Sequence, residues 1–146
     1  MWRCSKVGCV VHVAEAMIER REALRGRLKV LLVEDEAIIR HHLASELRGA
    51  KYEVIEASNA DEALKILYSL PFDLMISDVV MPGSMDGVEL AARAREVRPS
   101  MKIIIVSGRL LQAPSQDLAD GYFAKPYGCS TVLRSCRNLL DARPSS

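Results

Sequence analysis

From Arg27 onward, short apolar runs alternate with segments in which apolar residues recur every three or four positions. The runs have the length of strands, and the spaced segments have the period of amphipathic helices. Five runs predict strands, at residues 28–33, 53–57, 74–77, 102–107 and 121–124. Because the two kinds of segment alternate, we expect repeated strand–helix units around a parallel sheet, which is a doubly wound α/β fold.

The first two predicted helices have recognisable ends. Apolar residues at four-residue spacing from Ile39 to Leu47 predict a helix that closes near Gly49, because glycine readily takes the left-handed cap conformation. Asn59 is followed three positions later by Glu62, which predicts a capping box at the start of the second helix.

The later helices differ in how clearly the sequence marks them. Apolar positions predict a third helix that ends at Arg98 and Pro99, and a closing helix over residues 132–140. Pro114 interrupts the stretch between them, where only a short turn near Ser115 to Ala119 fits the pattern. We therefore expect the fourth helix of the fold to be shortened or irregular.

Composition places the chain among ordinary globular proteins. It has 146 residues, 49% of them hydrophobic, with 20 basic and 19 acidic side chains, which excludes collagen-like, coiled-coil and disordered classes. No apolar run approaches the roughly 20 residues that span a bilayer. We therefore expect a cytoplasmic protein with no membrane contact.

Charge divides the chain into a basic beginning and an acidic remainder. Residues 1–29 carry seven Lys or Arg and three Asp or Glu. The sequence predicts a basic, partly helical extension over 1–27, a folded domain over 28–142 and a tail over 143–146. A basic arm of this kind could touch RNA or an acidic membrane, but with Trp2 as its one aromatic residue a solvated arm is favoured.

The cysteines predict neither disulfides nor a strong metal site. A chain this apolar does not need disulfide bridges, so its four cysteines are expected to be free thiols. Cys4, Cys9 and His12 have a spacing that only loosely resembles a zinc site, because the close pair of cysteines that is typical of zinc knuckles is missing.

Polar side chains follow four of the predicted strands. Glu34 and Asp35 follow the first, Asp78 the third, Ser107 ends the fourth and Lys125 follows the fifth. The carboxyl ends of parallel strands meet at one edge of the sheet, where ligands bind. Carboxylates that converge there repel one another unless a cation lies among them, and oxygen ligands favour Mg²⁺ or Mn²⁺.

This set of groups is suited to phosphoryl transfer. A carboxylate can attack phosphorus and form an aspartyl phosphate, and Asp78 is the candidate because it follows a central strand. The metal and the Lys125 ammonium would offset the charge of the phosphoryl group, while Ser107 offers a hydroxyl donor.

In order and spacing, these segments resemble the receiver domain of two-component response regulators. The matching segments are residues 33–36, 77–83, 86–87, 106–108 and 125–126. The resemblance implies a flavodoxin-like five-stranded parallel sheet of order 2-1-3-4-5. The sequence differs from the usual receiver pattern in two places. The loop at 81–87 is one residue longer than the commonest form, and the stretch from 107 to 125 is shorter than usual.

The resemblance also implies roles for individual residues. It makes Asp78 the phosphoacceptor and Lys125, in a commonly cis bond to Pro126, the partner of the phosphoryl group. The remaining roles are Glu34, Asp35 and the Val80 carbonyl around Mg²⁺, Ser107 as the switch hydroxyl, and Tyr122 as the aromatic switch residue.

We expect a stand-alone response regulator rather than an ordinary enzyme. It would accept a phosphoryl group from a sensor histidine kinase or a phosphotransfer protein and pass the signal to a downstream protein, or act as a phosphate shuttle or sink. No direct DNA binding is expected, and a homodimer is compatible with the sequence.

Two other functions share part of this pattern. One is a pseudo-receiver that acts as an interaction module without phosphorylation, which the intact acidic cluster argues against. The other is a phosphatase of the haloacid dehalogenase type, whose nucleophile lies on the first strand in a D-x-D pattern. Glu34 and Asp35 are adjacent, so this class fits the sequence poorly.

Overall fold

The computed structural model describes residues 12–17, 20, 26–108 and 118–141. Within them the chain forms alternating strands and helices, in the order predicted. Their bounds are β1 Lys29–Val33, α2 Ala37–Gly49, β2 Glu53–Ala57, α3 Ala60–Ser69, β3 Leu74–Asp78, α4 Gly87–Val97, β4 Lys102–Ser107, β5 Gly121–Ala124 and α5 Cys129–Asp141.

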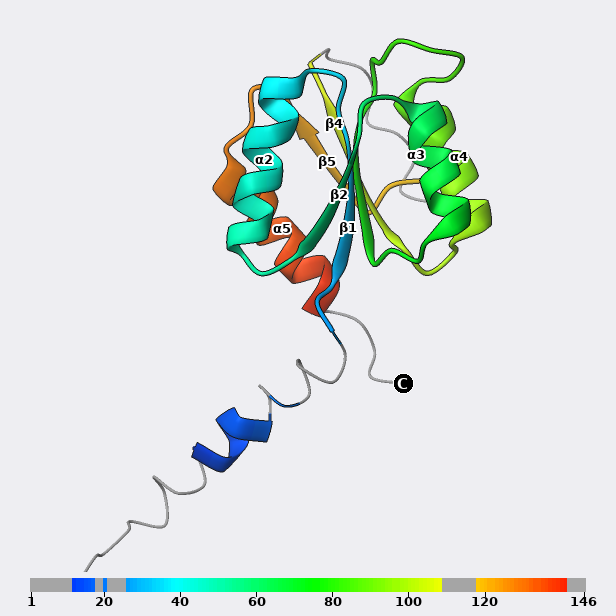
Figure 1. Cartoon of the computed structure of the whole chain (residues 1–146). Coiled ribbons are helices and arrows are strands. Elements are labelled where there is room, and N and C mark those ends of the chain that lie inside the picture. The colour runs from blue at the N-terminus through cyan, green and yellow to red at the C-terminus, as the bar shows by residue number, and fades with distance from the viewer. Residues whose placement is uncertain (1–11, 18–19, 21–25, 109–117, 142–146) are drawn as a thin grey trace, which may run out of the picture.

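The sheet is parallel throughout and has the order β2-β1-β3-β4-β5. Helices α2 and α5 cover one face, and α3 and α4 cover the other (Figure 1). This confirms the doubly wound fold and the strand order implied by the resemblance. The order changes direction between β1 and β3, so the loops that follow these two strands separate above the sheet and leave room for a site.

The core has two layers because side chains alternate across a strand. In β1, Leu31 and Val33 pack in the layer under α3 and α4, whereas Val30 and Leu32 pack in the layer under α2 and α5. All four are at most 2% exposed. A central parallel strand is covered on both faces, which explains why the sequence of β1 is almost continuously apolar.

The predicted glycine cap of α2 is wrong. The helix ends at Gly49, but among the described non-glycine residues the left-handed position is Lys51, with φ of 73°. The Lys51 and Tyr52 amides donate to the carbonyls of Arg48 and Leu47 over 3.0 and 3.1 Å. These bonds satisfy the free carbonyls of the last turn, so the reversal comes two residues after the glycine.

The start of α3 confirms Asn59 as the N-cap. The Glu62 amide donates to Asn59 Oδ1 over 2.8 Å. The Glu62 carboxylate accepts from the amide and hydroxyl of Ser58, over 2.9 and 2.8 Å. The reciprocal bond of the predicted capping box therefore goes to the residue before the cap.

Several predictions fall largely outside the described residues. The irregular fourth helix is one, because only Gly108 and residues 118–120 are described between β4 and β5. In the basic extension, residues 12–17 and 20 are helical, and residues 1–11, 18–19 and 21–25, with Cys4 and Cys9 among them, lie outside the described residues. Cys129 and Cys136 are free thiols.

No helix in the described ranges is both long and apolar enough to span a membrane. A cytoplasmic location stays a prediction.

Candidate functional site

The strand register brings two acidic residues together at the carboxyl edge of the sheet. Val33 of β1 pairs with Ser77 of β3, so Glu34 and Asp78, which follow them, are neighbours. Both are buried, at 4% and 7% exposure. The Glu34 amide donates to Ala57 on the other side of β1 over 3.1 Å, which extends the sheet pairing to the first acidic residue.

Lys125 completes this pair from the loop after β5. Its Nζ lies 2.8 Å from Glu34 Oε2 and 2.8 Å from Asp78 Oδ2. Its amide donates to the Ser107 carbonyl over 2.7 Å, which ties the start of the loop to the end of β4. One ammonium thus bridges two buried carboxylates, an arrangement that the sequence analysis did not foresee.

The charges of these groups depend on one another. Burial raises the pKa of Glu34, and the hydrogen bonds from Lys125 and from the Glu36 amide offset this only in part. Burial lowers the pKa of Lys125, but its hydrogen bonds to Asp78 and Glu34 outweigh this and raise the pKa above its ordinary value. Lys125 therefore stays an ammonium, and removing it would leave the carboxylates to repel each other.

A third carboxylate makes the cluster a fitting site for a divalent cation. Glu34, Asp35 and Asp78 each offer an oxygen, and these oxygens lie within 4.8 Å of one another. Asp35 is exposed, so a cation would be reached by water on that side. Oxygen donors with open positions suit Mg²⁺, which keeps several waters when it binds proteins.

The loop that carries Val80 is held at both ends. The Val79 amide donates to Val106 over 3.0 Å, and the Gly87 amide donates to the Val79 carbonyl over 2.8 Å. A Cβ at Gly87 would clash with the Asp78 carbonyl and lie 2.9 Å from Val79 Cα. Glycine is therefore required where α4 begins, because the helix starts against the end of β3.

A contact that the sequence analysis did not predict holds this loop to α3. Ser84 Oγ donates to Asp61 Oδ1 over 2.6 Å, and the Ser84 amide lies 3.3 Å from Asp61 Oδ2. These bonds lower the pKa of Asp61. Gly83 has φ of 121°, so the loop contains a turn that favours glycine.

The two predicted switch residues lie on neighbouring strands. Ser107 is fully buried at the end of β4. Tyr122 is half-buried in β5, pairs with Ile105 of β4 and packs against the layer under α3 and α4. The structure therefore gathers Glu34, Asp35, Asp78 and Lys125 tightly, and Tyr122 lies further along the sheet.

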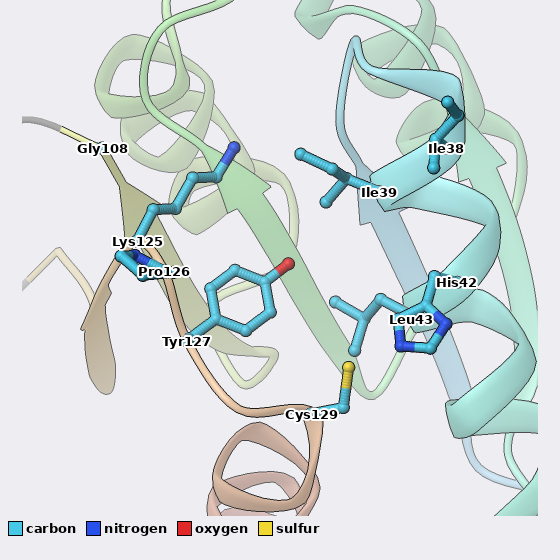
Figure 2. A pocket seen from close by; sticks show the side chains of 9 residues that line it. All are labelled: Ile38, Ile39, His42, Leu43, Gly108, Lys125, Pro126, Tyr127 and Cys129. Carbon is cyan, nitrogen blue, oxygen red and sulfur yellow. The ribbon is translucent and has the colours of Figure 1, made fainter.

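An apolar groove of about 630 Å³ adjoins the acidic cluster. It runs between the first turns of α2 and the loop from β5 to α5, and Lys125 lies at its edge (Figure 2). Ile38 is 86% exposed beside it. Its lining residues are Ile38, Ile39, His42, Leu43, Gly108, Lys125, Pro126, Tyr127 and Cys129. The feature of the sequence that could have indicated this groove is Ile38, an isoleucine outside the apolar stripe of α2.

The family model described as "Response regulator receiver domain" matches residues 30–136. Among curated proteins, the receiver protein CpdR of Brucella abortus is 41% identical over 118 residues, which are 78% of this chain and 98% of CpdR. The sensor kinase CckA of the same species is 36% identical over 137 residues. That match covers 90% of this chain and only 14% of the kinase.

Solved structures of receiver proteins are similar over most of their length. TrrA of Thermotoga maritima, described in complex with Mg²⁺-BeF, has a TM-score of 0.71 and 34% identity over 77% of this chain and 99% of TrrA. A CheY-like receiver domain protein of Methanospirillum hungatei has a TM-score of 0.72 and 30% identity, over 80% of this chain and 95% of that one.

Proposed function

This chain belongs to the response regulator receiver domain family, and on that premise we propose that Asp78 is the side chain on which it accepts a phosphoryl group. The observation that carries the proposal is the convergence of Glu34, Asp35, Asp78 and Lys125 at one edge of the sheet. The family is a phosphoacceptor family and not one of classical enzymes.

The transfer needs a nucleophile and compensation of charge. A carboxylate oxygen of Asp78 attacks the phosphorus of a phosphohistidine, the P–N bond breaks, and the histidine leaves with the electron pair and takes up a proton. The product is an acyl phosphate. Lys125, which contacts Asp78 at 2.8 Å, would pair its ammonium with the oxygens of the incoming group.

We propose that Glu34, Asp35, Asp78 and the Val80 carbonyl hold Mg²⁺, with Mn²⁺ as a substitute. The donor set fits a hard divalent ion, since every ligand is oxygen. When bound, the ion would neutralise negative charge that develops on the phosphoryl oxygens. The complex of TrrA with Mg²⁺-BeF is in keeping with this assignment for a relative.

Ser107 and Tyr122 are proposed to carry the change of state to the surface. Ser107 ends β4, and its carbonyl accepts from the Lys125 amide. A new bond from its hydroxyl to a phosphoryl group would pull on this strand end. Tyr122 lies on the adjacent strand β5 and is half-buried, so it can adjust to a shift of β4 with little loss of packing.

The phosphodonor is proposed to be a sensor histidine kinase or a histidine phosphotransfer protein. The groove beside Lys125 is placed to receive an apolar side chain of this donor, since Ile38 is exposed at its edge. The downstream partner would be a protein, or the chain would serve as a phosphate shuttle or sink. Residues 28–142 form the receiver in this proposal, with 1–27 as a basic extension and 143–146 as a tail.

Incubation with acetyl phosphate and Mg²⁺ tests the phosphoacceptor directly. Intact-mass measurement is expected to show the gain of one phosphoryl group in the wild type and none in Asp78→Asn. Asp73→Asn is the matched control, because Asp73 lies near the opposite end of the same strand and caps the start of β1 through the Lys29 amide. An equal gain in Asp78→Asn would refute the assignment.

A further inference from the structure

The chain bends at Asp35, just after it leaves β1. Glu34 continues the sheet through its amide, which donates to Ala57 over 3.1 Å. Its carbonyl lies where the strand pairing ends, so it needs another donor. The side chains on either side of the peptide bond between Glu34 and Asp35 are the two acidic groups that would share a cation.

Arg40 supplies that donor. One terminal nitrogen of its guanidinium donates to the Glu34 carbonyl over 2.7 Å. Its Nε lies 3.4 Å from Glu56 Oε1 on β2, and the side chain is only 14% exposed. Arginine suits this position because its planar head can make both contacts at once, which a lysine ammonium on a flexible stem cannot do as rigidly.

The Glu56 carboxylate that contacts the Arg40 guanidinium has two further partners on α2. Glu56 also accepts from Arg48 over 3.1 Å and from His41 Nδ1 over 2.8 Å. The Arg40 amide donates to the Glu36 carbonyl over 2.9 Å. Three side chains of α2, those of Arg40, His41 and Arg48, thus converge on Glu56 of β2. Arg40 also reaches the acidic loop, through the backbone carbonyl of Glu34.

We propose that Arg40 is a positioning residue that fixes the peptide between Glu34 and Asp35, so that both carboxylates face one cation. This inference rests on the proposed function. Outer-shell partners of metal ligands typically change metal affinity by about 10-fold to 100-fold when removed. We expect the loss of Arg40 to weaken cation binding by about tenfold, at the lower end of that range.

The sign of the effect separates positioning from simple charge. A guanidinium near a cation site repels the cation, so by charge alone its removal would tighten binding. Loss of positioning would weaken binding. Arg40→Gln is therefore the informative variant, and Arg48→Gln is its matched control, because Arg48 also contacts Glu56 but does not reach Glu34.

The experiment measures Mn²⁺ binding to the unphosphorylated full chain by electron paramagnetic resonance, with Mg²⁺ as competitor. We expect Arg40→Gln to bind Mn²⁺ about tenfold more weakly and Arg48→Gln to match the wild type. Hydrogen exchange without metal is expected to be faster at the Glu36 amide in Arg40→Gln, since this amide donates to Glu34 Oε1 over 3.2 Å.

Unchanged or tighter binding by Arg40→Gln would overturn the inference, as would an equal loss in Arg48→Gln. Should Arg40→Gln fail to fold, Arg40→Lys decides, because it keeps the charge but cannot make both contacts as rigidly, and Mn²⁺ binding as tight as in the wild type would then overturn the inference. Wild-type Mn²⁺ binding that does not depend on Asp35, tested with Asp35→Asn, would overturn the proposed cation site and this inference together. A normal Asp35-dependent site with an unaffected Arg40→Gln would overturn this inference alone.

Discussion

Lys125 determines how charge is balanced among the buried acidic residues. Its ammonium lies 2.8 Å from both Glu34 and Asp78, and in the metal-free protein it compensates their repulsion. Sequence analysis predicted each of these residues at a strand end but assigned the neutralising role to a divalent ion. It could not foresee the bridge, because the reach of a lysine side chain depends on the loop that carries it.

Replacing Lys125 with methionine is expected to make stability depend on Mg²⁺. Without metal, the variant should lose about 2 kcal/mol of unfolding free energy, because it leaves two buried carboxylates with no cation. Added Mg²⁺ should restore much of this loss by binding the folded state. Urea unfolding with EDTA and with Mg²⁺ measures both effects, and a variant as stable as the wild type in EDTA would contradict the account.

Cys136 gives a second prediction at this scale, concerning pH. Its thiol is fully buried on α5, and burial raises its pKa to about 12. In the unfolded chain the thiol ionises near pH 8.5. Between these values the unfolded state has lost the proton and the folded state keeps it, so stability contributed by the neutral thiol falls as pH rises.

We therefore expect Cys136→Ala to lose less stability than the wild type between pH 8 and pH 10, by about 1 to 2 kcal/mol. Urea unfolding at the two pH values measures the difference. Cys129→Ala is the control, because Cys129 is only half-buried. Its removal should have a smaller effect on the stability lost between pH 8 and pH 10. Parallel losses in wild type and Cys136→Ala would contradict the prediction.

At the scale of elements, the sequence predicted the strands better than the conformation in which a helix is capped. Strands β1 and β4 are buried on both faces, so their apolar runs coincide with their bounds to within a residue. The end of α2 at Gly49 was predicted, but its left-handed cap was not, because Lys51, and not Gly49, adopts that conformation. Which residue reverses the chain depends on where the following strand must start, and a local pattern does not contain that information.

The N-cap of α3 allows an element-scale test. Asn59→Ala removes the bond from the Glu62 amide to Asn59 Oδ1, and we expect a loss of about 1 kcal/mol. Asn138→Ala on the exposed side of α5 is the matched control and should stay within about 0.5 kcal/mol of the wild type. Chemical denaturation of both variants decides, and equal stability of the two would count against the cap.

For the whole molecule, topology converts separate strand ends into one site. Glu34, Asp78 and Lys125 lie far apart in the sequence, and the order β2-β1-β3-β4-β5 brings them to one edge. Because that edge is predictable from strand alternation, the acidic cluster was predictable too. The groove was not, since its walls come from α2 and from the loop before α5, whose approach depends on packing of the whole layer (Figure 2).

The groove leads to a prediction about the phosphodonor. Ile38→Asp is expected to slow transfer from a phosphorylated histidine phosphotransfer protein of the same organism by about tenfold, because a charge replaces an exposed apolar contact. Phosphorylation by acetyl phosphate should be unchanged. Tyr68→Asp is the control, because Tyr68 is also an exposed hydrophobic residue but lies on α3. A matching loss with acetyl phosphate would mean that Ile38 affects the acidic site and not docking.

The most direct test of the central claim is to find where the phosphoryl group is attached. The protein is phosphorylated with acetyl phosphate and Mg²⁺ and then reduced with borohydride, which converts an aspartyl phosphate to homoserine that peptide mass spectrometry can locate. The account predicts homoserine at position 78, with its yield abolished by EDTA. Homoserine at Asp35, or a label that persists at its full level in EDTA, would contradict it.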